Sequence, residues 1–401
     1  MRVTTLPLAV TAYTATSALG FGLDAHLDAL CQQRSGLRAN DFSNTPLPCW
    51  IGRVDGLEDV ALPARYAEWD CRNNRLAWLG LNQDDFMTKV HAAHERYGAA
   101  RLALLLGTST ASIAATEEGY RRLEGERLPT DLHHKGIHTP HSLTAFVAAA
   151  LNIRGPSLTI STACSSSAKV FASAERLIRS GLADAAIVGG VDSLCDSTLF
   201  GFNALELVSP EPCRPFDASR CGISIGEAAG FALLERIETH PDAPLRLLGC
   251  GESSDAHHMS TPDPEGAGAE LALRNLFDHS GLDLSQVDYI NLHGTASQKN
   301  DAMEAALIAR LFPDSTRVSS TKGLTGHTLG AAGILEAVIS LLALRGGFVP
   351  GNAGAMRPDP ICAAHFAWHN ETRPVHVALS HSFGFGGSNA CLAFARADAT
   401  A

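Results

Sequence analysis

Residues 157–180, with the sequence SLTISTACSSSAKVFASAERLIRS, predict a short strand, a sharp turn of small residues and a helix that opens at Cys164. Residues 317–344, RVSSTKGLTGHTLGAAGILEAVISLLAL, repeat this order, with a glycine-containing turn and an almost wholly apolar helix just after His327. In each turn, small residues allow one side chain to project from a bend beside the exposed N–H groups of a helix start. The chain is therefore predicted to contain two related halves.

Short apolar and β-branched runs alternate with longer helical patterns along much of the chain. The predicted strands are residues 102–106, 157–162, 185–188, 289–292 and 317–320. The helix predicted over 165–180 places Ala168, Phe171 and Ile178 on one side, and Gly181 ends it. This alternation is typical of βαβ units, so we expect an α/β fold with a largely parallel sheet.

Prolines and polar residues separate the two predicted halves. Pro241, Pro244 and the polar run 253–268 interrupt the apolar pattern. We therefore place the boundary near residue 250. Residues 1–250 form an N-terminal half that carries Cys164, and residues 251–401 form a C-terminal half that carries His293 and His327.

The composition excludes several classes of protein. With 401 residues, 45% hydrophobic and 18% charged, the chain can bury a large core and lacks the composition of a disordered protein. Its 31 Lys and Arg against 42 Asp and Glu give a net charge of −11, which disfavours binding to nucleic acid phosphates. We therefore expect no nucleic acid partner.

Cysteine usage and apolar stretches indicate where the protein works. The ten cysteines are scattered without a C-x-x-C pair, which is typical of a reducing compartment. Residues 1–20 hold a mildly apolar run interrupted by threonines, so we predict a first strand rather than a signal peptide. The apolar stretch 330–344 is shorter than the ~20 residues of a membrane span and contains Glu336. We expect a cytoplasmic protein without membrane insertion.

Cys164 is the candidate nucleophile. At a helix start, the partial positive charge of the N-terminal amides lowers the pKa of a thiol and favours the reactive thiolate. The alternative is a buried cysteine that acts as a small hydrophobic residue. The run of serines that follows Cys164 in TACSSS is a poor choice for core packing, so we favour the catalytic interpretation.

Two histidines follow glycine-containing patterns. His293 lies in NLHGTAS at the end of a predicted strand, and His327 lies in TKGLTGHTLGAAG. A lone histidine in such a turn is more often structural, but a helix-start cysteine in the same chain favours catalysis. The glycine run 382–389, SFGFGGSN, resembles a dinucleotide-binding loop, but no helical pattern or downstream acidic residue follows it, so we reject a dinucleotide site.

Together with PCRPFD (212–217) and GEAAG (226–230), these segments closely resemble the elongating β-ketoacyl-acyl carrier protein synthases of the thiolase superfamily. The resemblance implies a duplicated, five-layered αβαβα sandwich, usually a homodimer. It implies decarboxylating Claisen condensation with malonyl-acyl carrier protein in fatty acid, polyene or polyketide elongation. It also implies no bound cofactor, because the acyl carrier protein brings the phosphopantetheine arm.

The resemblance assigns roles to the central residues. Cys164 takes the acyl chain from a carrier-protein thioester, which divides the condensation into two steps. The backbone N–H groups of Cys164 and Phe385 hold the thioester oxyanion. His293 and His327 match the pair that donates hydrogen bonds to the enolate formed by decarboxylation of the malonyl group.

The same resemblance assigns supporting residues. Lys322 and Glu304 match a charged pair that orders the site; the alternative is an ordinary ion pair on a helix face. Thr295 and Ser297 match positions that hydrogen-bond the phosphopantetheine arm, to which Phe385 also belongs. Relatives usually have Thr at position 297 and Pro at position 298, where this chain has Ser297 and Gln298.

Two further positions concern the acyl chain. Thr110 and Phe202 fall where relatives line the acyl pocket, and the small polar Thr110 would reshape the pocket for a specialised polyene or polyketide chain. Core packing is the alternative for both residues. Cys221 stands where an acidic residue is usual.

Two groups of arginines are candidates for carrier docking. Carrier proteins of this pathway are typically acidic, so a chain of net charge −11 needs a local basic rim to attract them. Arg72 with Arg75, and Arg121, Arg122 and Arg127, form such groups in the N-terminal half. We expect Arg72 and Arg122 to contact the carrier. The alternative is a solvated helix face, since acidic residues lie beside the second group.

A histidine-rich run is the only candidate metal site. His133, His134, His138 and His141 accompany Asp131, with pairs at metal-like spacing. Gly136 and Pro140 break any helix that could present these side chains together. We therefore predict no metal site.

Other functions remain as alternatives. Thiolases and initiating synthases act on coenzyme A thioesters, but typically combine Cys with His and Asn or with a second Cys, unlike the His293 and His327 pair. A chain-length-factor-like subunit shapes a partner's tunnel without catalysis, and loss of the nucleophile marks that class. Cys164 is present, although a heterodimer with a partner subunit stays open.

Overall fold

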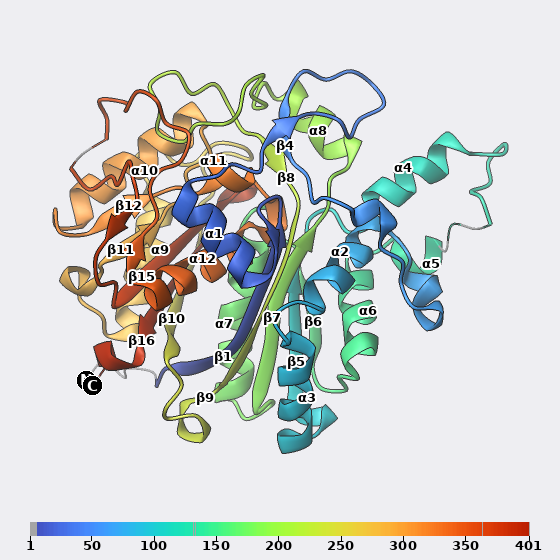
Figure 1. The fold of residues 1–401 in the computed structure, drawn as a ribbon, viewed down its shortest axis with the longest axis horizontal. Coiled ribbons are helices and arrows are strands. Elements are labelled where there is room, and N and C mark those ends of the chain that lie inside the picture. Colours follow the sequence, from blue (N-terminus) through green and yellow to red (C-terminus); the bar gives the residue numbers. More distant parts are fainter. Residues whose placement is uncertain (1–5, 131, 133, 363, 401) are drawn as a thin grey trace.

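The computed structural model describes residues 6–130, 132, 134–362 and 364–400. Its centre is a large mixed sheet to which each half of the chain contributes one set of strands (Figure 1). The C-terminal set runs in the order β12 (Arg317–Ser319), β11 (Tyr289–Asn291), β15 (Val377–Gly384), β16 (Ser388–Arg396) and β10 (Leu245–Ser254). The N-terminal set runs in the order β6 (Ser157–Ile160), β5 (Leu102–Gly107), β7 (Ala185–Asp192), β9 (Ala228–Arg236) and β1 (Leu8–Ser17).

The two sets share one pairing pattern. β5 is parallel to β6 and β7, and β11 is parallel to β12 and β15. The next strand is antiparallel in each set, β9 against β7 and β16 against β15. The predicted duplication is confirmed, but the expected largely parallel sheet is wrong. β16 follows β15 through a tight turn at Phe385–Gly387, and such a hairpin connection forces antiparallel pairing.

The predicted boundary at residue 250 lies inside β10. This strand pairs with β16 from Leu245 to Ser254, whereas it meets β1 only at Leu8↔Leu247 and Ala9↔Arg246. β10 therefore belongs to the C-terminal set, which begins immediately after Pro244.

Two helices lie between the sets of strands. α7 (Ser166–Arg179) packs on β5 and β7 of one set and on β10 and β16 of the other. α12 (Ala332–Gly346) packs on β15 and β16 and also on β9 and β1, and it contacts α7. The outer faces are covered by α2 (Arg72–Leu81), α3 (Phe86–Tyr97) and α6 (His141–Leu151) on one side, and by α9 (Ala267–Ser280) and α10 (Gln298–Leu311) on the other. These layers are the predicted thiolase-like sandwich.

The strands and the helix predicted from local patterns are present. β5, β6, β7, β11 and β12 match the five predicted strands, and β1 matches the predicted N-terminal strand. α7 matches the predicted helix over 165–180, and Gly181 after its end has a φ of +74°. Glycine adopts this left-handed conformation without the steric cost that a side chain brings.

The apolar helix of the C-terminal half is a core helix. The stretch Leu329–Gly346 is long and apolar enough to cross a membrane, but 89% of it is buried inside the protein. The helix is apolar on nearly all sides, as expected of a helix that both sets of strands enclose. Glu336 is the acidic side chain within this helix, and it is 3% exposed.

The remaining elements surround this core. The other helices are α1 (Gly22–Gln32), α4 (Ile113–Arg121), α5 (His134–Ile137), α8 (Asp196–Ala204) and α11 (Lys322–Thr325). The remaining strands are β2 (Gly20–Phe21), β3 (Arg38–Ala39), β4 (Trp50–Gly52), β8 (Ile225–Gly226), β13 (Phe348–Val349) and β14 (Glu371–Thr372). α4 and α5 project from the body of the molecule on the right of Figure 1.

Glycines allow the central helices to approach closely. A Cβ atom on Gly333 of α12 would lie 2.5 Å from the backbone nitrogen of Ala168 in α7. A Cβ atom on Gly107 of β5 would lie 2.4 Å from the backbone nitrogen of Ser167. Since real Cβ atoms do not approach this closely, a side chain at either position would push α7 away from α12 or from β5.

Candidate active site

Cys164 lies in a sharp turn between β6 and α7. Ala163 has a φ of +52°, an uncommon conformation for a residue with a side chain, and α7 begins two residues after Cys164, at Ser166. The following serines close the turn: the hydroxyl of Ser165 donates to the Thr162 carbonyl at 2.9 Å, and that of Ser166 donates to the Ala163 carbonyl at 2.6 Å. The serine hydroxyls therefore stabilise the turn that orients the Cys164 side chain.

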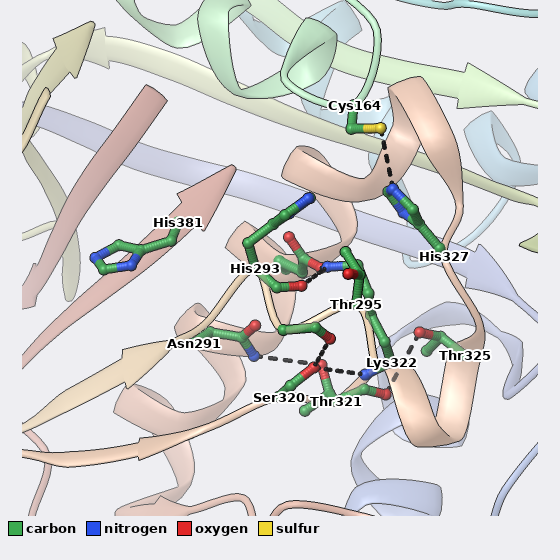
Figure 2. Close-up of polar contacts among 12 residues, drawn as sticks. Cys164, Asn291, His293, Thr295, Ser320, Thr321, Lys322, Thr325, His327 and His381 are labelled. Atoms are coloured by element: carbon green, nitrogen blue, oxygen red, sulfur yellow. Dashed lines mark hydrogen bonds and ion pairs between the residues drawn. The ribbon is translucent and has the colours of Figure 1, made fainter. Parts of the chain in front are cut away.

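The sulfur of Cys164 is buried against His327. The residue is 4% exposed, and its Sγ lies 3.0 Å from Nε2 of His327 (Figure 2). Burial raises the pKa of the thiol to about 12, against the opposing charge of Lys322. The expected lowering of this pKa at a helix start is wrong in this structure, because desolvation of the thiolate outweighs the N-terminal amides. The resting sulfur is a thiol that needs a base.

His293 and His327 form a pair. Their ring centroids are 5.3 Å apart with the planes at 84°, and both residues are 3% exposed. Burial and the charge of Lys322 lower the pKa of both imidazoles well below the usual range, so both rings are neutral near pH 7. Neither Nδ1 atom has a hydrogen-bond partner among the described residues. Figure 2 shows the His293 ring directed toward Cys164 and His327.

Lys322 pairs with Glu336 rather than with Glu304. Its ammonium contacts the Glu336 carboxylate and donates to the carbonyl oxygen of His293. Burial raises the pKa of Glu336 to about 7, although the charge of Lys322 acts in the opposite direction. The predicted pair of Lys322 with Glu304 is therefore wrong, because α12 places Glu336 against Lys322.

Glu304 supports the site from another direction. On α10, its carboxylate accepts the backbone N–H groups of His293 at 2.9 Å and Gly294 at 2.8 Å. It also contacts Nδ1 of His381 at 3.1 Å. Lys322 thus binds the carbonyl of His293 while Glu304 binds its amide, so both predicted residues act on the same backbone unit.

Phe385 and its neighbours complete the reaction centre. The backbone N–H of Phe385, in the turn between β15 and β16, forms a hydrogen bond that favours the thiolate of Cys164. Phe385 also lines the same cavity as Cys164, and its amide stays the predicted second donor to an oxyanion there. The structure thus brings Cys164, Phe385, His293 and His327 together, as the sequence predicts.

A cavity of about 460 Å³ opens onto the reaction centre. Thr295 and Ser297 line it, and their hydroxyl oxygens are 2.9 Å apart. Phe202 also lines it, with its ring centroid 5.6 Å from that of Phe385. The predicted phosphopantetheine and acyl-pocket residues Thr295, Ser297 and Phe202 therefore face one space.

Thr110 does not line this cavity. It is 1% exposed, and its hydroxyl donates to Oδ1 of Asp192 at 2.9 Å. Asp192 also accepts the hydroxyl and amide groups of neighbouring residues after β5 and the amide of Gly330 at 2.6 Å. The assignment of Thr110 to the acyl pocket stays a prediction, and the structure shows its hydroxyl bound to a buried carboxylate.

Several supporting residues were missed at the level of sequence. Asp301 of α10 accepts the amide of Thr295 at 3.1 Å and lies 3.5 Å from Nε of Arg220. Glu336 has a signal in the sequence, because it is the single acidic residue of a strongly apolar helix. His381 carried none, because nothing local distinguishes it from a core residue.

The arginines predicted for carrier docking differ in their surroundings. Arg72 is mostly buried, and its guanidinium binds both carboxylate oxygens of the fully buried Glu227 at 2.6 and 2.9 Å. Its assignment to docking is wrong, because its charge is already held inside the fold. Arg122 is 43% exposed and lies 3.3 Å from Glu118 on the same helical segment.

The histidine-rich run shows no metal centre among the described residues. Asp131 and His133 lie outside the described residues, and the structure does not describe the side chain of His134. Within the described ranges, no group of three or more His, Cys, Asp or Glu side chains is arranged to hold a metal ion.

Comparison with known proteins identifies the family. Residues 84–240 match the family model "Beta-ketoacyl synthase, N-terminal domain", and residues 246–356 match "Beta-ketoacyl synthase, C-terminal domain". These two ranges contain Cys164, His293 and His327, the residues that meet at the cavity.

Similar proteins cover most of the chain. Nodulation protein E of Rhizobium meliloti is 36% identical over 305 residues, 74% of this chain and 76% of that protein. The mitochondrial 3-oxoacyl-[acyl-carrier-protein] synthase of Arabidopsis thaliana is 38% identical over 268 residues, 62% of this chain and 58% of that protein. The solved complex of the ketosynthase ApeO with its chain length factor ApeC from Xenorhabdus doucetiae matches with a TM-score of 0.89 and 36% identity, covering 98% of both chains. From the sequence matches and this geometry, we conclude that the chain belongs to the β-ketoacyl synthase family.

Proposed function

We propose that Cys164, His293 and His327 carry out the two half-reactions of carrier-dependent Claisen condensation in this enzyme. The family and its relatives support 3-oxoacyl-carrier protein synthesis in fatty acid or polyketide elongation. The observation that carries the residue assignment is the 3.0 Å contact between Sγ of Cys164 and Nε2 of His327, with His293 beside them at the cavity.

In the first half-reaction, the Cys164 sulfur attacks the thioester carbonyl of an acyl-carrier protein. The thiol proton moves to Nε2 of His327, the group within reach, and then to the leaving thiolate of the phosphopantetheine arm. A new carbon–sulfur bond forms on Cys164 as the old one breaks. The N–H groups of Cys164 and Phe385 hold the oxyanion of the tetrahedral intermediate.

In the second half-reaction, malonyl-carrier protein loses carbon dioxide and its enolate attacks the acyl group on Cys164. The enolate oxygen needs hydrogen-bond donors, and each neutral imidazole offers one N–H. Because neither Nδ1 atom is bonded within the described ranges, His327 is free to carry its proton on Nε2 in this step. Cys164 leaves as a thiolate and takes up one proton from the solvent, which balances the negative charge that decarboxylation of the malonyl carboxylate leaves behind.

Mass spectrometry tests the assignment directly. Incubation with acyl-carrier protein should add the acyl mass to the peptide that contains Cys164. Addition of malonyl-carrier protein should then release carbon dioxide and return Cys164 to its free mass. Acylation of a different cysteine, or product formation without acylated Cys164, would contradict the assignment.

The proposal also covers the pathway, the cellular location and the cofactor requirement of the enzyme. We expect a cytoplasmic enzyme without a bound cofactor, acting on acyl- and malonyl-carrier protein. A coenzyme A-dependent thiolase reaction is the alternative that the paired histidines disfavour. Mass spectrometry of the carrier-bound products will identify chain length and distinguish fatty acid from polyene or polyketide synthesis.

The partner subunit is a separate proposal. We expect a dimer, with a homodimer as the first expectation and a heterodimer as the alternative, since ApeO was solved with a chain length factor. The edge strand β6 supports an interface, because it ends the sheet and its Leu158 is 45% exposed. Sedimentation of the purified chain should show a dimer, and a monomer that becomes active only with a second ketosynthase-like subunit would favour the heterodimer.

A further inference from the structure

A third buried histidine lies behind the pair at the cavity. His381, in β15, is fully buried and does not line the cavity. Its Nδ1 lies 3.1 Å from Oε1 of Glu304, and its Nε2 has no hydrogen-bond partner in the part of the chain that the structure describes. Figure 2 shows His381 on one side of His293 and the contact between Cys164 and His327 on the other.

Glu304 links His381 to His293. Oε1 of Glu304 accepts both the His293 amide, at 2.9 Å, and the contact from Nδ1 of His381, while Oε2 accepts the Gly294 amide at 2.8 Å. A carboxylate held at both oxygens keeps one orientation, so the contact from His381 limits its rotation. Gly294 packs closely against Ser320, because a Cβ atom at position 294 would lie 2.5 Å from the Cβ of Ser320.

An aromatic ring makes a second connection. The ring of Phe383 lies 5.3 Å from that of His381 and 5.9 Å from that of His293. Phe383 follows His381 by two residues in β15, so both side chains leave the same face of the strand. His381 therefore approaches His293 through a carboxylate on one side and an aromatic ring on the other.

We propose that His381 is a positioning residue for decarboxylation: its Nδ1 fixes the Glu304 carboxylate, which holds the His293 backbone opposite His327. This inference rests on the proposed roles of His293 and His327. A buried imidazole with an unbonded nitrogen costs stability compared with an apolar side chain of similar size. Its contact with Glu304 gives this polar residue a use at the site.

Variants at position 381 separate this role from simple packing. In His381→Asn, the amide nitrogen is as many bonds from Cα as Nδ1 of histidine is, so it can donate to Glu304. In His381→Gln, the amide nitrogen lies one bond farther away, and His381→Leu has no donor. Carbon dioxide release from malonyl-carrier protein should fall about 10–100-fold in the Leu and Gln variants and less than about threefold in the Asn variant.

Acylation of Cys164 provides the second measurement. It should stay within about twofold of wild type in all three variants, because His381 does not contact the sulfur or His327. His365→Leu is the matched control, since His365 is also buried but binds the Phe312 carbonyl at 3.1 Å. This control should lose thermal stability without losing carbon dioxide release per folded molecule.

The outcomes distinguish the proposals. Equal decarboxylation in the Asn and Gln variants, or equal losses in both half-reactions, would overturn the positioning role of His381. If His381→Leu does not fold, the comparison of Asn with Gln still decides. Wild-type decarboxylation in His293→Ala would instead refute the proposed function of His293, whatever the variants at position 381 do.

Discussion

The turn after β6 and the turn after β12 occupy corresponding places in the two halves, but they satisfy their polar groups differently. Around Cys164, the hydroxyls of Ser165 and Ser166 bond to the turn, and that of Ser167 accepts the amide of Ile334 at 2.9 Å. Around His327, buried polar atoms without described partners accumulate: Nδ1 of His293, Nδ1 of His327, Nε2 of His381 and Oε2 of Glu336.

This difference indicates a division of tasks between the halves. The polar groups of the N-terminal turn bond to one another, and the turn orients one sulfur, that of Cys164. The C-terminal turn keeps neutral donors and a buried ion pair in a region where unsatisfied groups are costly. Such groups are expected where protons and hydrogen bonds must change partners during a reaction.

The largest expected effect is on the N-terminal side. Cys164→Ala should lower condensation by at least about 10³-fold, because it removes the sulfur that lies 3.0 Å from Nε2 of His327. Cys250→Ala, at a buried cysteine of β10, is the control and should still form the acyl-enzyme. Condensation by the Cys164 variant at the wild-type rate would remove the sulfur from the mechanism.

The second effect separates the two histidines. His293→Ala and His327→Ala should each lower carbon dioxide release by about 10²–10³-fold, since each loses a donor to the enolate. Only His327→Ala should also slow acylation of Cys164, because His327 lies 3.0 Å from the sulfur. Intact-mass kinetics measure acylation, and equal acylation rates in both variants would contradict the proton transfer to His327.

The third effect compares buried ion pairs with surface charges. Arg72→Gln leaves the Glu227 carboxylate buried without its partner and should reduce the free energy of unfolding by ~3 kcal/mol. Arg122→Glu, at an exposed site, should change it by less than ~0.5 kcal/mol. Urea denaturation measures both changes. If Arg72→Gln leaves the free energy of unfolding unchanged, Arg72 is again a candidate for carrier docking.

The fourth effect concerns pH. Burial raises the pKa of Glu336 from 4.5 to about 7, so the folded protein holds this proton more tightly than the unfolded chain. The contribution of Glu336 to stability is therefore greatest below pH 4.5 and is lost as the pH rises to about 7. His293 and His327, with lowered pKa values, act in the opposite direction.

The difference between wild type and Glu336→Gln isolates the carboxyl group. The unfolding free energy of wild type relative to this variant should decrease between pH 4.5 and pH 7 and stay level below that range. If this difference in unfolding free energy does not depend on pH, the Glu336 carboxyl group does not change its protonation between pH 4.5 and pH 7, and the predicted titration is wrong.

The smallest effect tests carrier binding. Arg122→Glu should raise KM for carrier-bound substrate by about two- to fivefold at low salt, with little change for a small pantetheine thioester. Physiological salt should reduce this difference, because the Debye length falls to about 8 Å. Equal changes on both substrates would indicate a defect in the active site instead.

Local patterns predicted the parts of the fold that depend on neighbours in sequence. The strand, turn and helix around Cys164 follow from an apolar run, small residues and helical spacing, and the structure has β6 and α7 there. The His327 turn follows in the same way. The antiparallel pairing of β15 with β16 does not follow from the sequence pattern, because the glycine run 382–389 does not by itself indicate the tight turn at Phe385–Gly387 that makes the hairpin.

Other parts depend on contacts that spacing does not encode. Lys322 lies between two acids along the chain, and the packing of α12 alone decides that Glu336 is its partner. The pKa of Cys164 depends on burial by both halves, which outweighs the local effect of the helix start. Thr110 binds Asp192, a residue more than eighty positions away, rather than facing the cavity.

The close contact between α12 and α7 at Gly333 has a mechanical consequence. Cys164 lies just before the N-terminus of α7, and His327 lies before the N-terminus of α12. The two helices contact each other at Gly333, which has no side chain. We therefore expect the distance between the Cys164 sulfur and the His327 imidazole to depend on the spacing of these two helices from different halves. The methyl group of Gly333→Ala would push the two helices apart. It would change the alignment of the Cys164 sulfur with the His327 imidazole and leave both reacting groups chemically unchanged.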